Sequence, residues 1–243
     1  MNLLLIDTSS PVCRVGRVAE GRLVDERQLE GENRHSEGLN PLISELMGRK
    51  EAYATLKGVV VINGPGSYTG LRIGAAFAKA LVLVTGCRLL AVNGLDVLAR
   101  QYQLDGYEVR EGDYLIPMVD ARRMEVFTQT IRLSANPVLV HPPGARILTA
   151  ECYRECAGGR LHFMGDGCAK FQEILEPTRR NEAEFVAVVN HRMDAMAELA
   201  VQQFEQERFV TDDYWQPDYH KEFYYPAPQQ KSASSLAGLP DTI

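Results

Sequence analysis

Two aspartates in this sequence each end a run of apolar residues, where a β-strand would deliver a carboxylate to the edge of a sheet. Asp7 follows residues 3–6, and Asp120 follows residues 114–119. Carboxylates that face one another across a cleft can act as general acid and general base. A carboxylate directly before a turn can equally accept hydrogen bonds from that turn. Both interpretations stay open, and spacing alone supports no serine–histidine–aspartate or cysteine–histidine set.

A glycine-rich loop at residues 63–70 lies between an apolar run and a long apolar segment. The strand–loop–helix order aims free backbone N–H groups at the space above the strand, and such groups favour anions. Gly64 and Gly66 allow a close backbone approach, while Ser67 and Thr69 could contact a phosphate or cap the helix. No Gly-Lys-Ser/Thr closes the loop, so it is not a Walker A motif. A phosphate cradle and a structural turn fit it equally well.

Two further turns could belong to the same site. One continues from Asp7 through Thr8 and Ser9, and the other comprises Gly165, Asp166 and Gly167. The second turn could be a degenerate phosphate turn. A plain turn needs no ligand, and we favour that interpretation.

Residues 71–84 are predicted to form a helix that is apolar almost all the way round, since only two of them are charged. Such a helix is buried on more than one side. It is either enclosed within its own domain or packed on its sheet by one face and on a partner protein by the other, and we favour the partner. Small residues at spacings of four would let another helix approach closely. The predicted interface residues are Gly70, Leu71, Gly74, Phe77, Ala78 and Leu81.

The composition excludes several classes of protein. With 45% hydrophobic and 24% charged residues among 243, the chain is typical of a globular protein. A net charge of −6 argues against unaided nucleic-acid binding. Five cysteines without a C-x-x-C pair indicate the reducing cytoplasm. Arg72 and Lys79 interrupt residues 71–84, so its charge-free stretches are far shorter than the about 20 apolar residues of a membrane span. Residues 3–6 are too few for a signal peptide.

Hydrophobic periodicity predicts three strands, then a helix, a strand, a helix, a strand and a short helix capped by Asn93. A strand meander followed by alternating units is the ribonuclease-H-like pattern, a mixed sheet with helices on its faces. A fainter copy begins at residues 114–119. After it we expect a proline-rich linker at residues 137–144, a helix at 149–156 and a last helix at 191–204.

The predicted fold class is therefore α/β, with two ribonuclease-H-like halves of the actin-like ATPase (ASKHA) type. Residues 1–105 form the first domain, with the glycine loop and the docking helix, and residues 106–215 form a degenerate second domain. Residues 216–243 are rich in proline and serine and are predicted to be a flexible tail.

Four motifs stand in the order and spacing of one family. They are I-D-T-S at 6–9, R-H-S-E at 34–37, G-P-G-S-Y-T-G-L-R-I-G at 64–74 and V-D-A-R at 119–122. On these motifs the chain resembles the TsaB family, also called YeaZ, over roughly residues 1–205. The run at 64–74 is the most specific of the four.

The resemblance implies a non-catalytic subunit. TsaB-like proteins pair with the catalytic paralogue TsaD and with the ATPase TsaE, and the complex adds a threonylcarbamoyl group to the adenosine 3′ of the anticodon in tRNAs that read codons beginning with A. The helix at residues 71–84 would dock TsaD, or a second copy of the chain in a homodimer. No cofactor is expected here, because ATP would be used by the complex, and tRNA would be contacted indirectly.

The catalytic relatives hold a metal with H-x-E-x-H on their first helix, whereas this chain has His35 and Leu39 at those positions. Leucine has no lone pair to donate. We therefore expect no metal site and an exposed His35. Two other hypotheses remain: a nucleotide-binding phosphotransferase or ATPase, suggested by the Asp7 turn and the glycine loop, and a metallopeptidase, suggested by the family's glycoprotease label.

Overall fold

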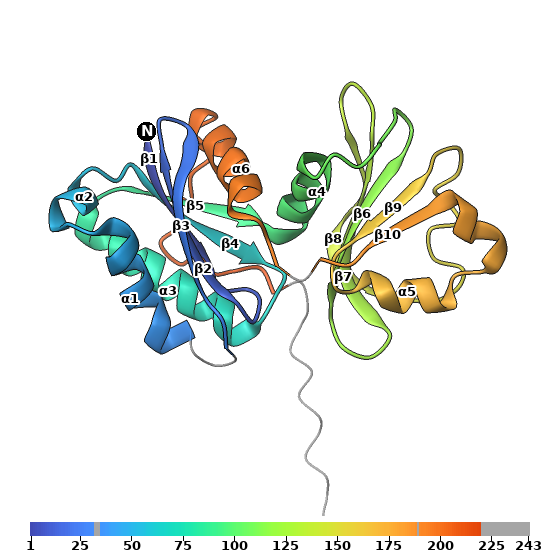
Figure 1. Cartoon of the computed structure of the whole chain (residues 1–243), viewed down its shortest axis with the longest axis horizontal. Helices are drawn as coiled ribbons and strands as arrows, with labels where there is room; N and C mark the ends of the chain where they lie inside the picture. Colours follow the sequence, from blue (N-terminus) through green and yellow to red (C-terminus); the bar gives the residue numbers. More distant parts are fainter. Residues whose placement is uncertain (32–34, 189, 220–243) are drawn as a thin grey trace, which may run out of the picture.

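The computed structural model describes residues 1–31, 35–188 and 190–219, which form two lobes side by side (Figure 1). Each lobe is built on a five-stranded sheet, in the orders β3-β2-β1-β4-β5 and β10-β9-β6-β7-β8. In both sheets three antiparallel strands are followed by two parallel ones. The second sheet repeats the topology of the first, so the two predicted ribonuclease-H-like halves are confirmed.

The elements of the first lobe agree with the prediction to within a few residues at most boundaries. Its strands are β1 (Asn2–Asp7), β2 (Cys13–Ala19), β3 (Arg22–Leu29), β4 (Gly58–Gly64) and β5 (Arg88–Asn93). Its helices are α1 (His35–Met47), α2 (Lys50–Ala54), α3 (Tyr68–Thr85), α4 (Gly94–Leu104) and α6 (Met193–Glu205). The Asn93 side chain accepts a hydrogen bond from the Leu95 N–H at 2.8 Å, which confirms the predicted cap of α4.

The second lobe contains β6 (Tyr114–Asp120), β7 (Glu125–Arg132), β8 (Val138–Ile147), β9 (Leu161–Met164), α5 (Cys168–Ile174), the 3-10 helix η1 (Pro177–Glu182) and β10 (Ala183–Val186). The predicted linker is instead strand β8, whose prolines are tolerated because β8 lies at the edge of its sheet. The predicted helix at 149–156 is a series of turns, in which Tyr153 has a φ of 63° that no helix accommodates. Residues 220–243 of the predicted tail lie outside the described residues.

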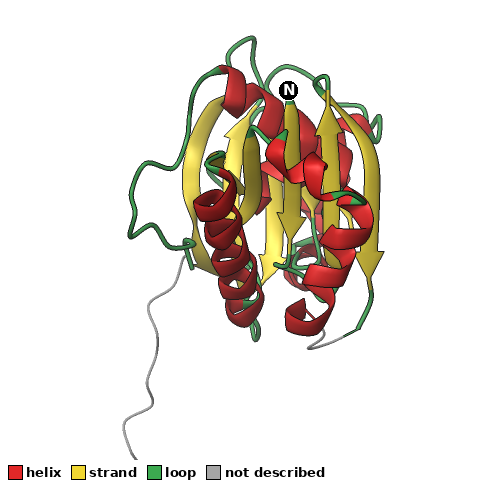
Figure 2. Ribbon diagram, turned by 90° about the vertical axis from the view of Figure 1, so that its left-hand side faces the viewer, coloured by secondary structure: helices red, strands yellow, loops and turns green. Residues whose placement is uncertain are grey.

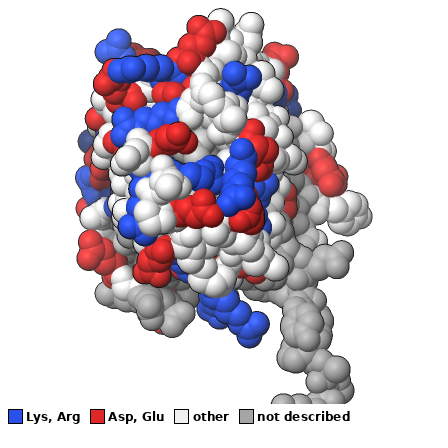
Figure 3. Space-filling model, turned by 90° about the vertical axis from the view of Figure 1, so that its right-hand side faces the viewer, with Lys and Arg blue, Asp and Glu red and all other residues white. Residues whose placement is uncertain are grey.

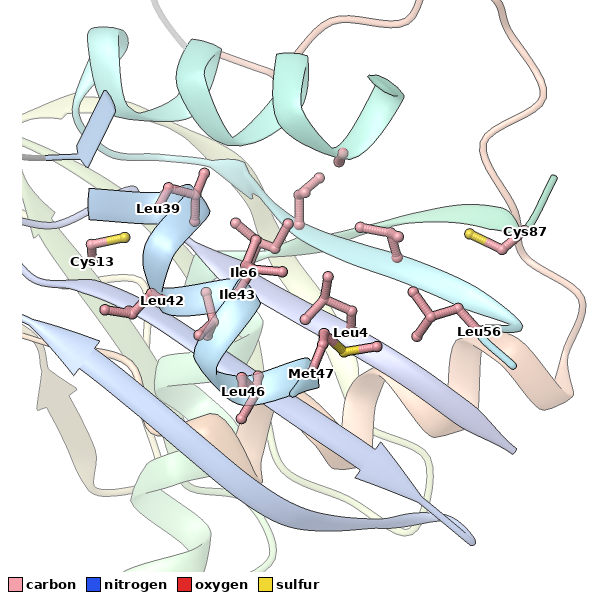
Figure 4. Packing of buried hydrophobic residues seen from close by; sticks show 14 of the residues in the cluster. Leu4, Ile6, Cys13, Leu39, Leu42, Ile43, Leu46, Met47, Leu56 and Cys87 are labelled. Carbon is pink, nitrogen blue, oxygen red and sulfur yellow. The ribbon is translucent and has the colours of Figure 1, made fainter. Parts of the chain in front are cut away.

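The central strands β1 and β4 are buried on both faces, which explains why their sequences do not alternate. Leu4 and Ile6 of β1 point toward α1 and α3, where Leu39 and Ile43 meet them (Figure 4). Seen from the side of the first lobe, helices lie in front of the strands (Figure 2). The intervening residue Leu5 points to the opposite face and packs with α6.

Helix α6 belongs to the first lobe, although the chain reaches it after completing the second sheet. Met196 and Ala200 are fully buried against Leu3, Leu5 and other residues of the first sheet. The prediction that residues 106–215 form one domain is therefore wrong at its C-terminal end. Helices α1 and α3 cover only one face of the first sheet, and its other apolar face is buried by the returning chain.

Helix α4 lies between the two sheets and packs on both (Figure 1). Val97 belongs to the core of the first lobe, whereas Leu98 and Tyr102 pack with Leu115 and Met164 of the second. The Tyr102 hydroxyl also lies 2.8 Å from Nδ1 of the buried His162 on β9. This shared apolar core and hydrogen bond hold the two lobes together.

Replacing Met196 with alanine tests the placement of α6. We expect the free energy of unfolding to fall by about 2–5 kcal/mol, because the substitution leaves a cavity in the core of the first lobe. Urea denaturation measures the loss, and amide exchange should quicken in β1 rather than in β6. The exposed Gln202→Ala on the same helix should change stability by less than about 0.5 kcal/mol. Faster exchange confined to β6 would contradict this assignment.

Candidate functional site: the cleft between the lobes and the free face of helix α3

A cavity of 540 Å³ lies between the lobes and brings together residues that are far apart in the sequence. Its wall on the first lobe includes Ser9, Gly66, Ser67 and Thr69. Its wall on the second lobe includes Asp120, Arg122 and Asp166. The three predicted turns therefore do converge on one cleft.

The glycine loop, however, packs against its own chain. The Ser67 N–H donates to the Ser9 carbonyl at 2.7 Å, and a Cβ added at Gly66 would lie 2.5 Å from that same oxygen. The Ser67 side chain caps α3 by accepting from the Gly70 N–H at 3.3 Å. Gly66 is thus explained by the close approach of the turn after β1, and Gly64 by that of the Asp218 carbonyl. The structure favours the interpretation of the loop as a structural turn.

Asp7 is fully buried beneath the cleft and is held by its own turn. It accepts hydrogen bonds from the Ser9 N–H at 2.9 Å and the Ser9 hydroxyl at 2.6 Å, and its other oxygen lies 2.9 Å from Nδ1 of His191. Burial alone would raise the pKa of Asp7, but the His191 charge and the hydrogen bonds outweigh it and hold the pKa below its ordinary value. No sequence signal predicted this partner, because His191 lies 184 positions away.

The Asp120 carboxylate is likewise engaged by neighbouring groups of the second lobe. It accepts a hydrogen bond from the Arg122 N–H, and it forms an ion pair with Lys170 at 2.7 Å. Of the two interpretations offered for Asp7 and Asp120, the structure therefore supports local hydrogen bonding in both cases.

The turn of Gly165, Asp166 and Gly167 is tied to the end of β6. Asp166 accepts a hydrogen bond from the Asp120 N–H at 2.8 Å. A Cβ at Gly165 would collide with the Met118 carbonyl, and one at Gly167 would lie 2.8 Å from Val126. The interpretation as a plain turn is sufficient to explain these glycines.

Helix α1 places His35 differently from the expectation. His35 was expected to be exposed, but it is buried, and its Nε2 lies 2.8 Å from the Ser10 carbonyl oxygen. Leu39 is 1% exposed and belongs to the hydrophobic core of Figure 4. The position that would offer the second metal ligand is therefore filled by a core side chain. Arg34, part of the R-H-S-E motif, lies outside the described residues.

Helix α3 has two distinct sides. Gly70, Leu71, Gly74 and Ala78 are buried within the lobe, and a Cβ at Gly74 would collide with the Thr8 hydroxyl. Assigning these four residues to the partner interface is therefore wrong, because they pack on their own lobe. Phe77 and Leu81 are partly buried.

The opposite side of α3 is apolar and open. We call the exposed residues Ala76, Ala80, Leu83 and Val84 the α3 free face; Ile73 and Phe77 beside it are partly buried and pack on the core of the lobe. Leu83 is 86% exposed and Val84 is 82% exposed. Among the described helices, α3 alone meets the length and composition of a membrane span, a test that a helix packed inside a lobe also passes.

Two ribonuclease-H-like lobes with a cavity between them define the actin-like class of folds. The family model described as "TsaD: tRNA N6-adenosine threonylcarbamoyltransferase" matches residues 30–188. The chain belongs to this family and, as its curated relatives indicate, to the TsaB branch of it.

The relatives include the tRNA threonylcarbamoyladenosine biosynthesis proteins TsaB of Bacillus subtilis and Haemophilus influenzae. They are 35% and 26% identical over 130 and 134 residues, which is 53% and 54% of this chain. These matches cover 54% and 55% of the relatives, so the chain spans about half the length of the curated relatives it matches. An uncharacterized protein of Mycobacterium tuberculosis is 31% identical over 198 residues, which is 77% of this chain and 84% of that protein.

A solved structure of similar fold is a YEAZ-like protein of Pseudomonas aeruginosa. It superposes with a TM-score of 0.72 at 21% identity and covers 90% of this chain and 99% of its own. At this identity the likeness concerns the fold.

The Asp7–His191 pair predicts how stability depends on pH. The folded pKa of Asp7 lies below the ordinary value of 3.8, so its stabilisation is present above about pH 4 and is lost as pH falls further. Asp7→Asn should cost about 3–5 kcal/mol near neutral pH, because it leaves a buried partner uncompensated. Urea unfolding at a series of pH values should show the difference from the unmodified chain shrinking in acid. The control is Asp120→Asn, at a more exposed carboxylate. If the difference in unfolding free energy between Asp7→Asn and the unmodified chain stays constant with pH, the stabilising role given to the Asp7–His191 pair is refuted.

Proposed function

We propose that the chain is a non-catalytic subunit in tRNA threonylcarbamoyladenosine biosynthesis that binds and supports the catalytic paralogue TsaD. In this proposal the complex adds threonylcarbamoyl to the adenosine 3′ of the anticodon in tRNAs that read codons beginning with A. The family membership supports the pathway, because the named relatives carry that description. The observation that carries the docking role is the α3 free face.

The α3 free face has the properties of a helix-docking surface. Its four residues are all apolar and exposed along one side of the helix, while the buried small residues fix the opposite side. Burying a leucine or valine side chain contributes about 1.5–3 kcal/mol, so Leu83 and Val84 together could anchor a partner helix. A contiguous exposed apolar surface is characteristic of an interaction site. The same face could pair two copies of this chain when TsaD is absent.

The absence of catalysis is supported by two features of the first lobe. Leu39 occupies the hydrophobic core where a metal-holding helix would carry its second histidine. Asp7 is enclosed by Ser9 and His191 rather than presented to the cleft. ATP is therefore assigned to the complex, through the ATPase TsaE, rather than to this chain.

Contact with tRNA is assigned to the partners. The net charge is −6, and the outward face of the second lobe shows acidic and basic side chains interspersed (Figure 3). Without a continuous basic field, this face offers little electrostatic attraction to phosphates. The five cysteines, all free in the described residues, fit a cytoplasmic setting.

The double substitution Leu83→Asp with Val84→Asp should abolish co-elution with TsaD, because two carboxylates would be desolvated in the interface. Both side chains are more than 80% exposed, so the variant should keep its fold and its melting temperature. Size-exclusion chromatography of the chain with and without TsaD measures the effect.

The matched control is Ile147→Asp, which changes a 70% exposed apolar residue on the second lobe. It should leave co-elution unchanged. Retained pairing in the double variant, or equal loss in the control, would overturn the docking surface proposed here.

The cavity between the lobes supports a second candidate, a nucleotide-binding enzyme of the actin-like class. Thr69 and Ser67 line it at the start of α3, where a helix N-terminus favours anions. We expect isothermal titration of the isolated chain with Mg·ATP to show no turnover, because Asp7 is engaged by its own turn. Tight binding accompanied by hydrolysis would favour the enzyme over the scaffold.

A further inference from the structure

Three potential metal ligands meet in the second lobe, far from α1. His141 lies on β8, while Glu155 and Cys156 lie in the connection between β8 and β9. One ligand atom from each falls within 4.8 Å of the other two. Nε2 of His141 is 3.4 Å from a Glu155 carboxylate oxygen, and Cys156 is only 5% exposed. Spacing along the chain does not reveal this cluster, because only the folding of β8 brings His141 to the cysteine.

Two buried polar atoms beside this cluster have no hydrogen-bond partner within the described part of the chain. They are Nδ1 of His141 and the hydroxyl oxygen of Thr130. Thr130 and His141 are paired across β7 and β8, so their side chains share one face of the sheet. A buried polar atom without a partner destabilises the fold, because it loses its hydrogen bonds to water and gains none. Two unpartnered atoms on paired residues therefore point to a polar occupant of this face of the sheet.

We propose that His141, Glu155 and Cys156 form a binding site for a zinc ion. Imidazole, carboxylate and thiolate are all zinc ligands, and the mixture of nitrogen, oxygen and sulfur disfavours magnesium and calcium, which take oxygen ligands. Three protein ligands leave a fourth position for water. On binding, the Cys156 thiol gives its proton to solvent and contributes the thiolate.

Arg146 sets the balance of charge at this site. Its guanidinium lies 3.4 Å from Glu155 and 4.7 Å from the centre of the Tyr153 ring. Without an ion, Arg146 compensates the carboxylate. Zinc must displace this ion pair, so Arg146→Gln should strengthen binding. The site would then join edge strand β8 to the turns that follow it.

The experiment is equilibrium dialysis of the full chain against Zn²⁺ after treatment with a chelator. We expect one zinc per chain, and a charge-transfer absorption from thiolate to metal when Co²⁺ is used instead. Cys156→Ser and His141→Gln should each weaken zinc binding more than tenfold. Loss of an outer-shell partner alone costs about tenfold, and these two residues are direct ligands. Cys152→Ser is the matched control, because Cys152 lies four positions away and outside the cluster.

Equal zinc binding by the unmodified chain and Cys156→Ser would overturn the site, as would an equal loss in Cys152→Ser. If Cys156→Ser does not fold, the Co²⁺ spectrum of the unmodified chain decides, since absence of the thiolate band refutes the proposal. The Leu83→Asp, Val84→Asp variant should bind zinc normally, which separates this site from the docking function.

Discussion

The turn after β1 packs backbone to backbone against the start of α3, and the rest of the first lobe depends on this contact. The Thr8 hydroxyl donates to the Gly70 carbonyl at 2.7 Å, and a side chain at Gly70 or Gly74 would occupy the same space as Thr8. Glycine is required here because only hydrogen fits between the two segments. The contact therefore sets the rotation of α3 about its own axis, which determines the residues that face the sheet and those that face outward.

The same turn joins the two ends of the chain. Asp7, one residue before Thr8, pairs with His191, which lies where the chain returns from the second lobe to begin α6. A buried carboxylate is stable only when an opposite charge or hydrogen bonds compensate it. The pair therefore links the return of the chain to the first lobe, just before α6, to the geometry of the turn after β1. The Asp7–His191 pair and the packing of α4 on both sheets together hold the two walls of the cleft in a defined position relative to each other.

Local patterns predicted most of the fold, but they could not predict which surfaces meet. Apolar runs and the Asn93 cap located β1, β4, β5 and α4, because those signals depend on neighbouring residues alone. The spacing of Gly70, Gly74 and Ala78 correctly indicated a close contact, yet it could not tell whether the contacting segment came from this chain or from another. The burial of His35 and the position of α6 depend on residues distant in sequence, and periodicity contains no such information.

The burial of Gly70, Gly74 and Ala78 within the lobe strengthens the case that α3 contacts another molecule through its exposed side. Gly70 and Gly74 make the close contact with Thr8, while Leu83 and Val84, at the far end of α3, stay exposed. Because the small residues satisfy the packing of the lobe at backbone distance, the large ones stabilise nothing within the described chain. Exposed leucine and valine at the end of a helix give no advantage to an isolated lobe, whereas they supply the apolar area that association needs.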